Sequence, residues 1–325
     1  MSQALPGYLL SGGALLFFTT AILVTRLASN RIPLALGFVI ATLTNVVFSG
    51  LAFAVQGVLS DQPVTWNTRS FWLFAVAGVF STYLGRWFFY ESVVRFGPAK
   101  ASVFQVSSPL FTAAMALVLL GERLTLPVAM GMVLTVGGLI LVSYKPGACG
   151  NGSVAPAEPA GLVVPVKADS ATPPLTLHQR LLKSVLLLGL ASSLAYAIGN
   201  VLRGSAVREW NEPILGGLIG AGFGLAMHLL FMPAKSALWI SLRQADRRGV
   251  WLYALIGVCT ISGQICTIGA MRFIPLSIAT LVTLCTPLLV FPLSYFLLKS
   301  RDGVTRATVA GCGLTLVGIF IIVLR

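Results

Sequence analysis

The stretch that decides the fold class begins at Pro98 and reads PAKASVFQVSSPLFTAAMALVLLGERLTLPVAMGMVLTVGGLILVS, residues 98–143. It contains two apolar runs, 98–119 and 125–143, with the charged pair Glu122 and Arg123 between them. An apolar run of about 18 residues or more is long enough to cross a bilayer as a helix. The stretch therefore predicts two consecutive membrane-spanning helices joined by a short polar turn.

Runs of this kind recur along all 325 residues, of which 57% are hydrophobic and 10% are charged. Soluble domains carry about a quarter charged residues, so this composition excludes an ordinary soluble protein. The alternating ten-residue segments of a membrane β-barrel do not occur. We predict an all-α integral membrane protein with ten transmembrane helices, at 7–25, 33–55, 70–94, 98–119, 125–143, 182–202, 213–232, 250–271, 275–297 and 307–324.

A segment rich in Pro, Ala, Gly and Ser divides the chain into two halves of five predicted helices each. We assign 1–144 to a first five-helix repeat, 145–181 to a flexible linker and 182–325 to a second five-helix repeat. The linker has no helical periodicity, and its composition is typical of flexible connections.

Short matching segments in the same order indicate that the halves are copies of each other. WLFAVAGV from Trp72 matches WLYALIGV from Trp251, and GMVLTVGG from Gly131 matches GCGLTLVG from Gly311. A duplicated unit is a common plan of secondary transporters. Because each copy has an odd number of helices, the second enters the membrane from the opposite side, so we expect inverted repeats.

The distribution of basic residues predicts the orientation in the membrane. The net charge is +13, but the basic residues lie singly or in short groups between apolar runs, so no nucleic-acid partner is expected. Loops after the odd-numbered helices carry most of the Lys and Arg, and the positive-inside rule places these loops in the cytoplasm and both termini outside. We expect a multi-pass protein of a bacterial inner membrane, surrounded by lipid, and predict no oligomeric state.

One pattern within the two halves is similar to a known family. Pro98 opens a helix, Ser108-Pro109-Leu110 lies at its centre, Leu-Gly-Glu ends it at Glu122, and a Gly-rich helix follows; the second half begins at Pro275 and has Thr286-Pro287-Leu288. This order resembles EamA-type transporters of the drug/metabolite transporter superfamily. The resemblance implies a ten-helix inverted-repeat bundle with a central solute cavity, and many such proteins export amino acids or other metabolites. The second half departs from the pattern, because Leu-Gly-Glu is replaced by LKSRD at 298–302.

Arg86 is the first candidate site residue, since an ionisable group inside a predicted membrane helix is costly and needs a reason. Tyr83, Trp87 and Tyr90 lie at helical spacing around it. We interpret these four as a cavity wall in which the guanidinium binds an anionic group and the rings pack on an apolar part of the solute. The alternative is a structural salt bridge, or an Arg86 side chain that extends to a nearby interface.

Other polar residues of the apolar runs are candidates for the same substrate site. We predict that Gln105 and Ser108, Gln264 and Asn45 line the cavity, although small hydroxyl residues also mediate close helix packing. Glu91 is a candidate for proton coupling, with an ion pair to Arg95 as its alternative.

The remaining polar residues are expected to have local roles or to lie at an interface. His228 is expected to be satisfied locally, and Arg203, at the predicted end of the sixth helix, is expected to lie at the membrane interface.

No motif for an enzyme, a nucleotide, a metal or a cofactor accompanies these residues. HExxH, GxSxG and Walker A sequences are absent, and none of the five cysteines forms a CxxC pair. We therefore predict a secondary transporter, not an enzyme, that exports a small metabolite such as an amino acid or organic acid by alternating access. The alternative is a membrane protein that does not transport, either a lipid-handling accessory subunit or an intramembrane enzyme.

Overall fold

The apolar runs fold as helices, because a helix satisfies its backbone hydrogen bonds without water. The computed structural model describes residues 4–28, 31–59, 65–89, 108–119, 125–143, 185–231, 245–286 and scattered positions between 289 and 321. Within these residues there is no strand, as the sequence predicts. The elements are α1 (Leu5–Ala28), α2 (Leu34–Leu59), α3 (Thr68–Ala77), η1 (Gly78–Gly85), α6 (Ser108–Leu119), α7 (Leu126–Ser143), α9 (Val185–Glu209), α10 (Pro213–Phe231), α12 (Arg247–Ala270) and α13 (Leu276–Leu284).

Four of the described helices are long and apolar enough to cross a membrane. The qualifying segments are Leu5–Thr25, Leu36–Leu59, Pro213–Phe231 and Arg247–Ala270. Each exceeds the length of about 18 apolar residues that a span requires. Parts of the other predicted spans lie outside the described residues, so the total of ten helices stays a prediction.

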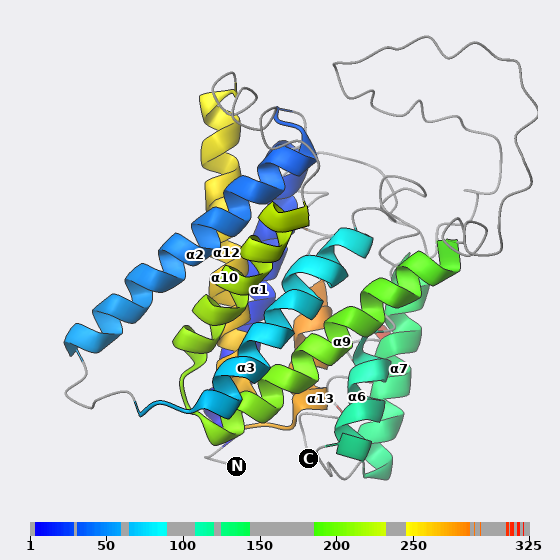
Figure 1. Cartoon of the computed structure of the whole chain (residues 1–325). Helices are drawn as coiled ribbons and strands as arrows, with labels where there is room; N and C mark the ends of the chain where they lie inside the picture. Colours follow the sequence, from blue (N-terminus) through cyan, green and yellow to red (C-terminus); the bar gives the residue numbers. More distant parts are fainter. Residues whose placement is uncertain are drawn as a thin grey trace, which may run out of the picture.

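Helices of the first half pack against helices of the second half in a pattern that repeats itself. In the first half, α1 contacts α12 and α13; its counterpart five predicted helices later, α9, contacts α3, η1 and α6. In the same way α2 contacts α10 and α12, whereas α10 contacts α2, α3 and η1. Figure 1 shows α1 running from the lower to the upper end of the bundle and α9 running the opposite way. The described helices thus have the arrangement expected of inverted repeats.

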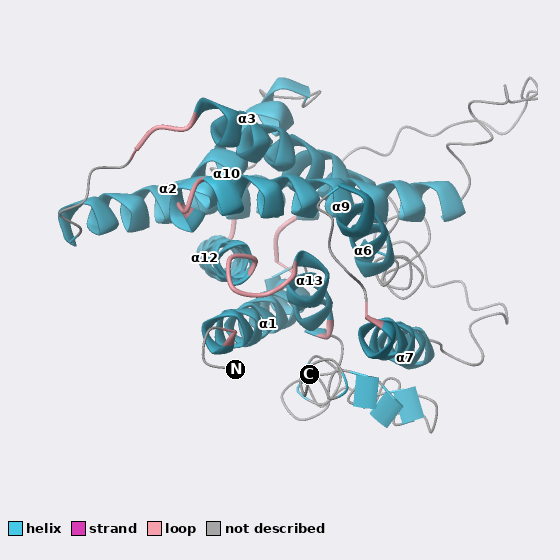
Figure 2. Cartoon of the chain, turned by 90° about the horizontal axis from the view of Figure 1, so that it is seen from below, coloured by secondary structure: helices cyan, strands magenta, loops and turns pink. Residues whose placement is uncertain are grey.

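Seen from below, the bundle has two sides (Figure 2). One side contains α2, α3, α9 and α10, and the other contains α1, α7, α12 and α13. The helices α10 and α12 contact each other between these sides. Residues far apart in the sequence, from both halves, therefore line the same interior.

Two glycines at equivalent positions of the halves allow the helices to cross closely. A Cβ atom added at Gly78 would lie 2.6 Å from the Cα atom of Gly220 on α10. A Cβ atom added at Gly257 on α12 would lie 2.6 Å from the carbonyl oxygen of Ala41 on α2. Small residues of this kind let membrane helices approach and gain van der Waals contact.

Polar contacts join the two halves at both ends of the bundle. At the end of the bundle where α12 begins, Arg31 donates to the Asp246 carboxylate at 2.9 Å, and Asp246 also caps α12 by accepting from the backbone N–H of Arg248. These hydrogen bonds lower the pKa of the Asp246 carboxyl group. At the lower end, the Arg69 guanidinium lies 2.9 Å from the Glu209 carboxylate, and the Gln56 amide donates to Glu212 at 3.1 Å.

Candidate functional site

A change of helix geometry directly precedes Arg86. The α-helical backbone of α3 continues at Gly78 as the π-helix η1, which ends at Gly85. The π-helical turn is wider than the α-helical one and occurs frequently at functional sites. The Gly85 carbonyl accepts a hydrogen bond from the Ser192 hydroxyl of α9 at 2.8 Å, so the end of η1 is attached to the second half.

One face of α9 follows η1 along its length. Ser192, Tyr196, Gly199 and Arg203 are three or four residues apart and share this face. A Cβ atom added at Gly199 would lie 2.6 Å from the Cβ atom of Ser81. Because Gly199 has no side chain, α9 packs close to η1. Arg203 can then reach Ser81 of η1, and Tyr196 can reach Arg86 directly after it.

Arg86 lies among aromatic side chains from both halves. Its guanidinium carbon is 5.2 Å from the centre of the Phe38 ring of α2, a cation–π contact. It also forms a side-chain hydrogen bond with the half-buried Tyr196 of α9 and interacts electrostatically with His228 of α10. The imidazole of His228 in turn packs edge-on against Phe38, with ring centres 4.6 Å apart.

Tyr83 belongs to the same aromatic group. Its ring stacks on Phe231 with centres 5.8 Å apart, and it lies 6.3 Å from the imidazole of His228. Tyr83 thus belongs to the aromatic group around Arg86 through His228, while four further rings come from helices distant in the sequence. Trp87 is 50% exposed at the bundle surface, so Tyr83 and not Trp87 packs with this group.

Arg203 is a site residue whose position in the structure differs from the one predicted from the sequence. The helix α9 extends to Glu209, seven residues beyond the predicted end at 202, so Arg203 lies inside the helix and not at its end. Its side chain is only 5% exposed, and its guanidinium donates a hydrogen bond to the Ser81 hydroxyl of η1. Its charge interacts with that of Arg86. The expectation that Arg203 lies at the end of the sixth helix is wrong, because α9 continues to Glu209 and Arg203 is buried against η1.

Neither Arg86 nor Arg203 forms an ion pair with a described acidic residue. The acidic residues of the described part of the chain are Glu209, Glu212 and Asp246, and all three lie at the ends of the bundle. The ion pairs among the described residues join Arg31 to Asp246 and Arg69 to Glu209, and neither includes Arg86 or Arg203. Within the described residues, these two cationic side chains therefore interact inside the bundle without a carboxylate partner.

Several predicted site residues lie elsewhere in the bundle. The Asn45 amide is buried at the contact of α2 with α12, 3.0 Å from the Thr260 hydroxyl. Ser108 is buried at the start of α6. Tyr90, Glu91 and Gln105 lie outside the described residues. The structure thus brings Arg86 and Tyr83 together but places Asn45 in a separate helix contact.

Gln264 is nearer to the start of η1. Its amide nitrogen is buried and has no hydrogen-bond partner among the described residues. A Cβ atom added at Gly220 would lie 3.8 Å from this nitrogen, which puts it beside the crossing of Gly78 and Gly220. The Thr82 hydroxyl of η1 and the Nε2 atom of His228 are likewise buried without a described partner. Groups of this kind require a polar partner, such as a solute or water, because an unmade buried hydrogen bond is costly.

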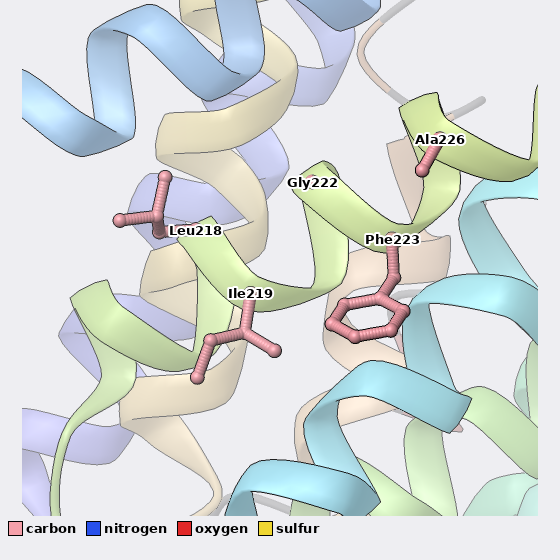
Figure 3. Close-up of a pocket in the computed structure, with 5 residues that line it drawn as sticks. All are labelled: Leu218, Ile219, Gly222, Phe223 and Ala226. Atoms are coloured by element: carbon pink, nitrogen blue, oxygen red, sulfur yellow. The ribbon is translucent and has the colours of Figure 1, made fainter. Parts of the chain in front are cut away.

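A hollow of about 300 Å³ on α10 is separate from these polar groups (Figure 3). It is lined by Leu218, Ile219, Gly222, Phe223 and Ala226, and none of these side chains has a polar atom. Such a surface cannot orient a polar solute, because orientation needs hydrogen-bonding or charged groups. We therefore assign the candidate site to the arginines and not to this hollow.

The described residues contain no set of metal ligands, because no three His, Cys, Asp or Glu side chains cluster there. The described cysteines Cys259, Cys266 and Cys285 are free thiols. The arrangement can therefore bind and orient an anionic group, but these residues show no assembled nucleophile or metal centre.

Comparisons with known proteins extend the observations on the fold. The profile of the EamA-like transporter family matches residues 5–144 and 183–324. A solved structure described only as "Crystal structure of protein" is similar with a TM-score of 0.64 and 17% sequence identity, over 99% of this chain and 96% of the other. At this identity the likeness concerns the fold alone. The comparison with curated proteins found no match.

Proposed function

The chain belongs to the EamA-like transporter family, and we propose that it is a secondary transporter that exports a small metabolite with an anionic group, such as an amino acid or organic acid. The observation that supports this most is the position of Arg86, which lies in a helix of the bundle and contacts Phe38 and Tyr196 from two other helices. A charge inside a membrane protein is costly and typically marks a solute or ion pathway.

The surroundings of Arg86 suit such a solute. A guanidinium presents planar N–H groups that match a carboxylate, and it stays protonated inside a protein. Phe38, Tyr83 and Phe231 supply apolar ring surface beside it. We infer that the guanidinium binds the anionic group while the rings contact the apolar part of the solute.

Alternating access would require the two halves to separate at one end while they stay joined at the other. The Arg31–Asp246 pair joins them at one end, and the Arg69–Glu209 pair joins them at the opposite end. Both pairs are partly exposed, and exposed pairs stabilise a structure only weakly, by about 0–1 kcal/mol. We propose that these pairs break alternately during transport. Contacts of this strength stabilise one conformation only slightly, so the protein can still convert to the other.

Reconstitution of the purified protein in proteoliposomes tests the function. Vesicles preloaded with radiolabelled amino acids or organic acids should release one class of solute faster than empty vesicles, and excess unlabelled solute should accelerate exchange. An Arg86→Gln protein that folds normally provides the matched control. If wild-type protein moves no solute from this panel in either direction, the transport proposal fails, and the alternative of a non-transporting membrane component gains support.

A further inference from the structure

We propose that the solute is a dianion, held by Arg86 and Arg203 together. This inference rests on the proposed transport function and specifies its substrate class. It adds a second binding residue, Arg203, that local sequence patterns assign to the membrane interface.

The packing of η1 on α9 places Arg86 and Arg203, which belong to different repeats, near enough for their charges to interact. Arg86 follows the π-helix η1 of the first half, whereas Arg203 lies on α9 of the second half. Arg203 is attached to Ser81 within η1, and Arg86 is attached to Tyr196, which is two turns before Arg203 on α9. Each arginine is thus positioned by the helix that carries the other, and Tyr196 interacts with both charges.

Electrostatics favours a divalent partner for this pair. Arg203 is only 5% exposed. Its Nε–H group has no hydrogen-bond partner among the described residues. Two like charges repel each other, and the buried Arg203 also carries a desolvation cost. A bound monoanion would neutralise one of the two charges, and a dianion would neutralise both.

Net charge also distinguishes a dianion from an amino acid. An amino acid with an uncharged side chain has one carboxylate and one ammonium group, so its net charge is zero. It therefore leaves the combined charge of Arg86 and Arg203 unchanged, whereas a dianion neutralises it. Two chemical sources fit the remaining requirement, a dicarboxylate and a phosphate monoester, and both form bidentate hydrogen bonds with guanidinium groups.

Ligand binding to the full-length protein tests the inference directly. The probes are the dicarboxylates malonate, succinate and glutarate, their monomethyl esters, methyl phosphate, and alanine as a zwitterion. Binding is measured by the ligand-induced rise in melting temperature in detergent, and transport by counterflow in proteoliposomes. Because a charge-assisted hydrogen bond contributes an affinity factor of roughly ten to a hundred, at least one dianion should bind about tenfold or more tightly than every half-ester. Preference for a dicarboxylate or for methyl phosphate identifies the source.

The Arg203→Gln variant separates binding from structure. It should reduce the affinity for the preferred dianion roughly ten- to a hundredfold and leave the affinity for the half-ester unchanged. Arg208→Gln, at an exposed position of the same helix, is the matched control and should leave both affinities unchanged. If Arg203→Gln does not fold, Arg203→Lys provides the same comparison, because it keeps the charge and loses the planar fork.

Three outcomes overturn the inference. The dianions bind no more tightly than the half-esters in wild-type protein, or alanine binds better than every dianion, or the Arg203 variant weakens dianion and half-ester equally. Each of these leaves the proposed transport function standing when any solute is exchanged across the membrane. Absence of exchange for the whole panel instead contradicts the proposed function itself.

Discussion

The crossing of η1 with α10 gives a quantitative prediction about Gly78. An alanine here would place its Cβ atom 2.6 Å from the Cα atom of Gly220, whereas ordinary contact begins at 3.4 Å. The carbonyl oxygen of Gly220 would lie closer still, and both atoms belong to the backbone, so the helices must separate by more than about 0.8 Å to restore contact at 3.4 Å. Overpacking of this kind costs about 1–3 kcal/mol. Ser81, which accepts the hydrogen bond from Arg203, lies three residues after Gly78 in η1. A displacement of η1 should therefore also disturb Arg203 and reduce transport.

Gly222→Ala is the matched control for Gly78→Ala. Gly222 lies on α10, two residues after Gly220, and a Cβ atom added there would meet nothing within 4 Å. Both substitutions gain helix propensity, by up to about 1 kcal/mol, so their comparison isolates the steric effect. Thermal unfolding of the purified proteins in detergent measures the difference. If Gly78→Ala unfolds at the same temperature as Gly222→Ala, the close crossing of η1 and α10 does not stabilise the protein and our account of it is wrong.

Further predictions concern the charges of the bundle. Arg86→Lys should weaken transport of an anionic solute and Arg86→Gln should weaken it more, by roughly ten- to a hundredfold in apparent affinity, with melting temperatures that stay near wild type; equal loss of folding in both variants would support a structural role. Because hydrogen bonds from Arg31 and from the α12 backbone lower the pKa of Asp246, its contribution to stability is present above the ordinary aspartate value of about 3.9 and disappears as the pH falls through the lower folded value. The melting temperatures of wild type and Asp246→Asn should therefore differ at neutral pH and converge in acid, and a constant difference would exclude this linkage. We retain Glu91 as the proposed proton-coupling residue; Glu91→Gln should abolish the response of transport to a pH gradient, and wild-type rates would exclude the role. The charge bias predicts that a phosphatase fusion at Arg325 is active and a fluorescent-protein fusion there is dark, and the reverse pattern would invert the topology.

Part of the candidate site could be predicted from the sequence, because a charge within an apolar run is conspicuous without any tertiary information. Arg86 stands out in this way, and Tyr83 follows from helical spacing. Arg203 has the same chemistry, but the polar residues after position 202 predict that the helix ends there. In the structure α9 continues to Glu209. A charged residue followed by the apolar pair Ala206 and Val207 was the signal available for extending that helix.

The remaining members of the site depend on which helices meet. Phe38, Tyr196, His228 and Phe231 come from three helices other than the one that carries Arg86. Nothing in the local sequence around any of them indicates that they share one location. The π-helical geometry of η1 also changes the angular positions of its residues, so regular α-helical spacing does not show that Trp87 is exposed while Tyr83 packs inward.

The sequence by itself determined that this is a helical membrane protein, how the described helices follow one another, and that its halves are related. These properties depend on the length and composition of local runs, which act within single helices. Only the tertiary structure decided which faces of those helices lie inside the bundle. In a soluble helix the buried face is the apolar one, but in a membrane the lipid-facing side is apolar too, so hydrophobic periodicity loses this information. The association of Arg86 with Arg203 therefore arises from the packing of η1 on α9, where Gly199 permits the approach.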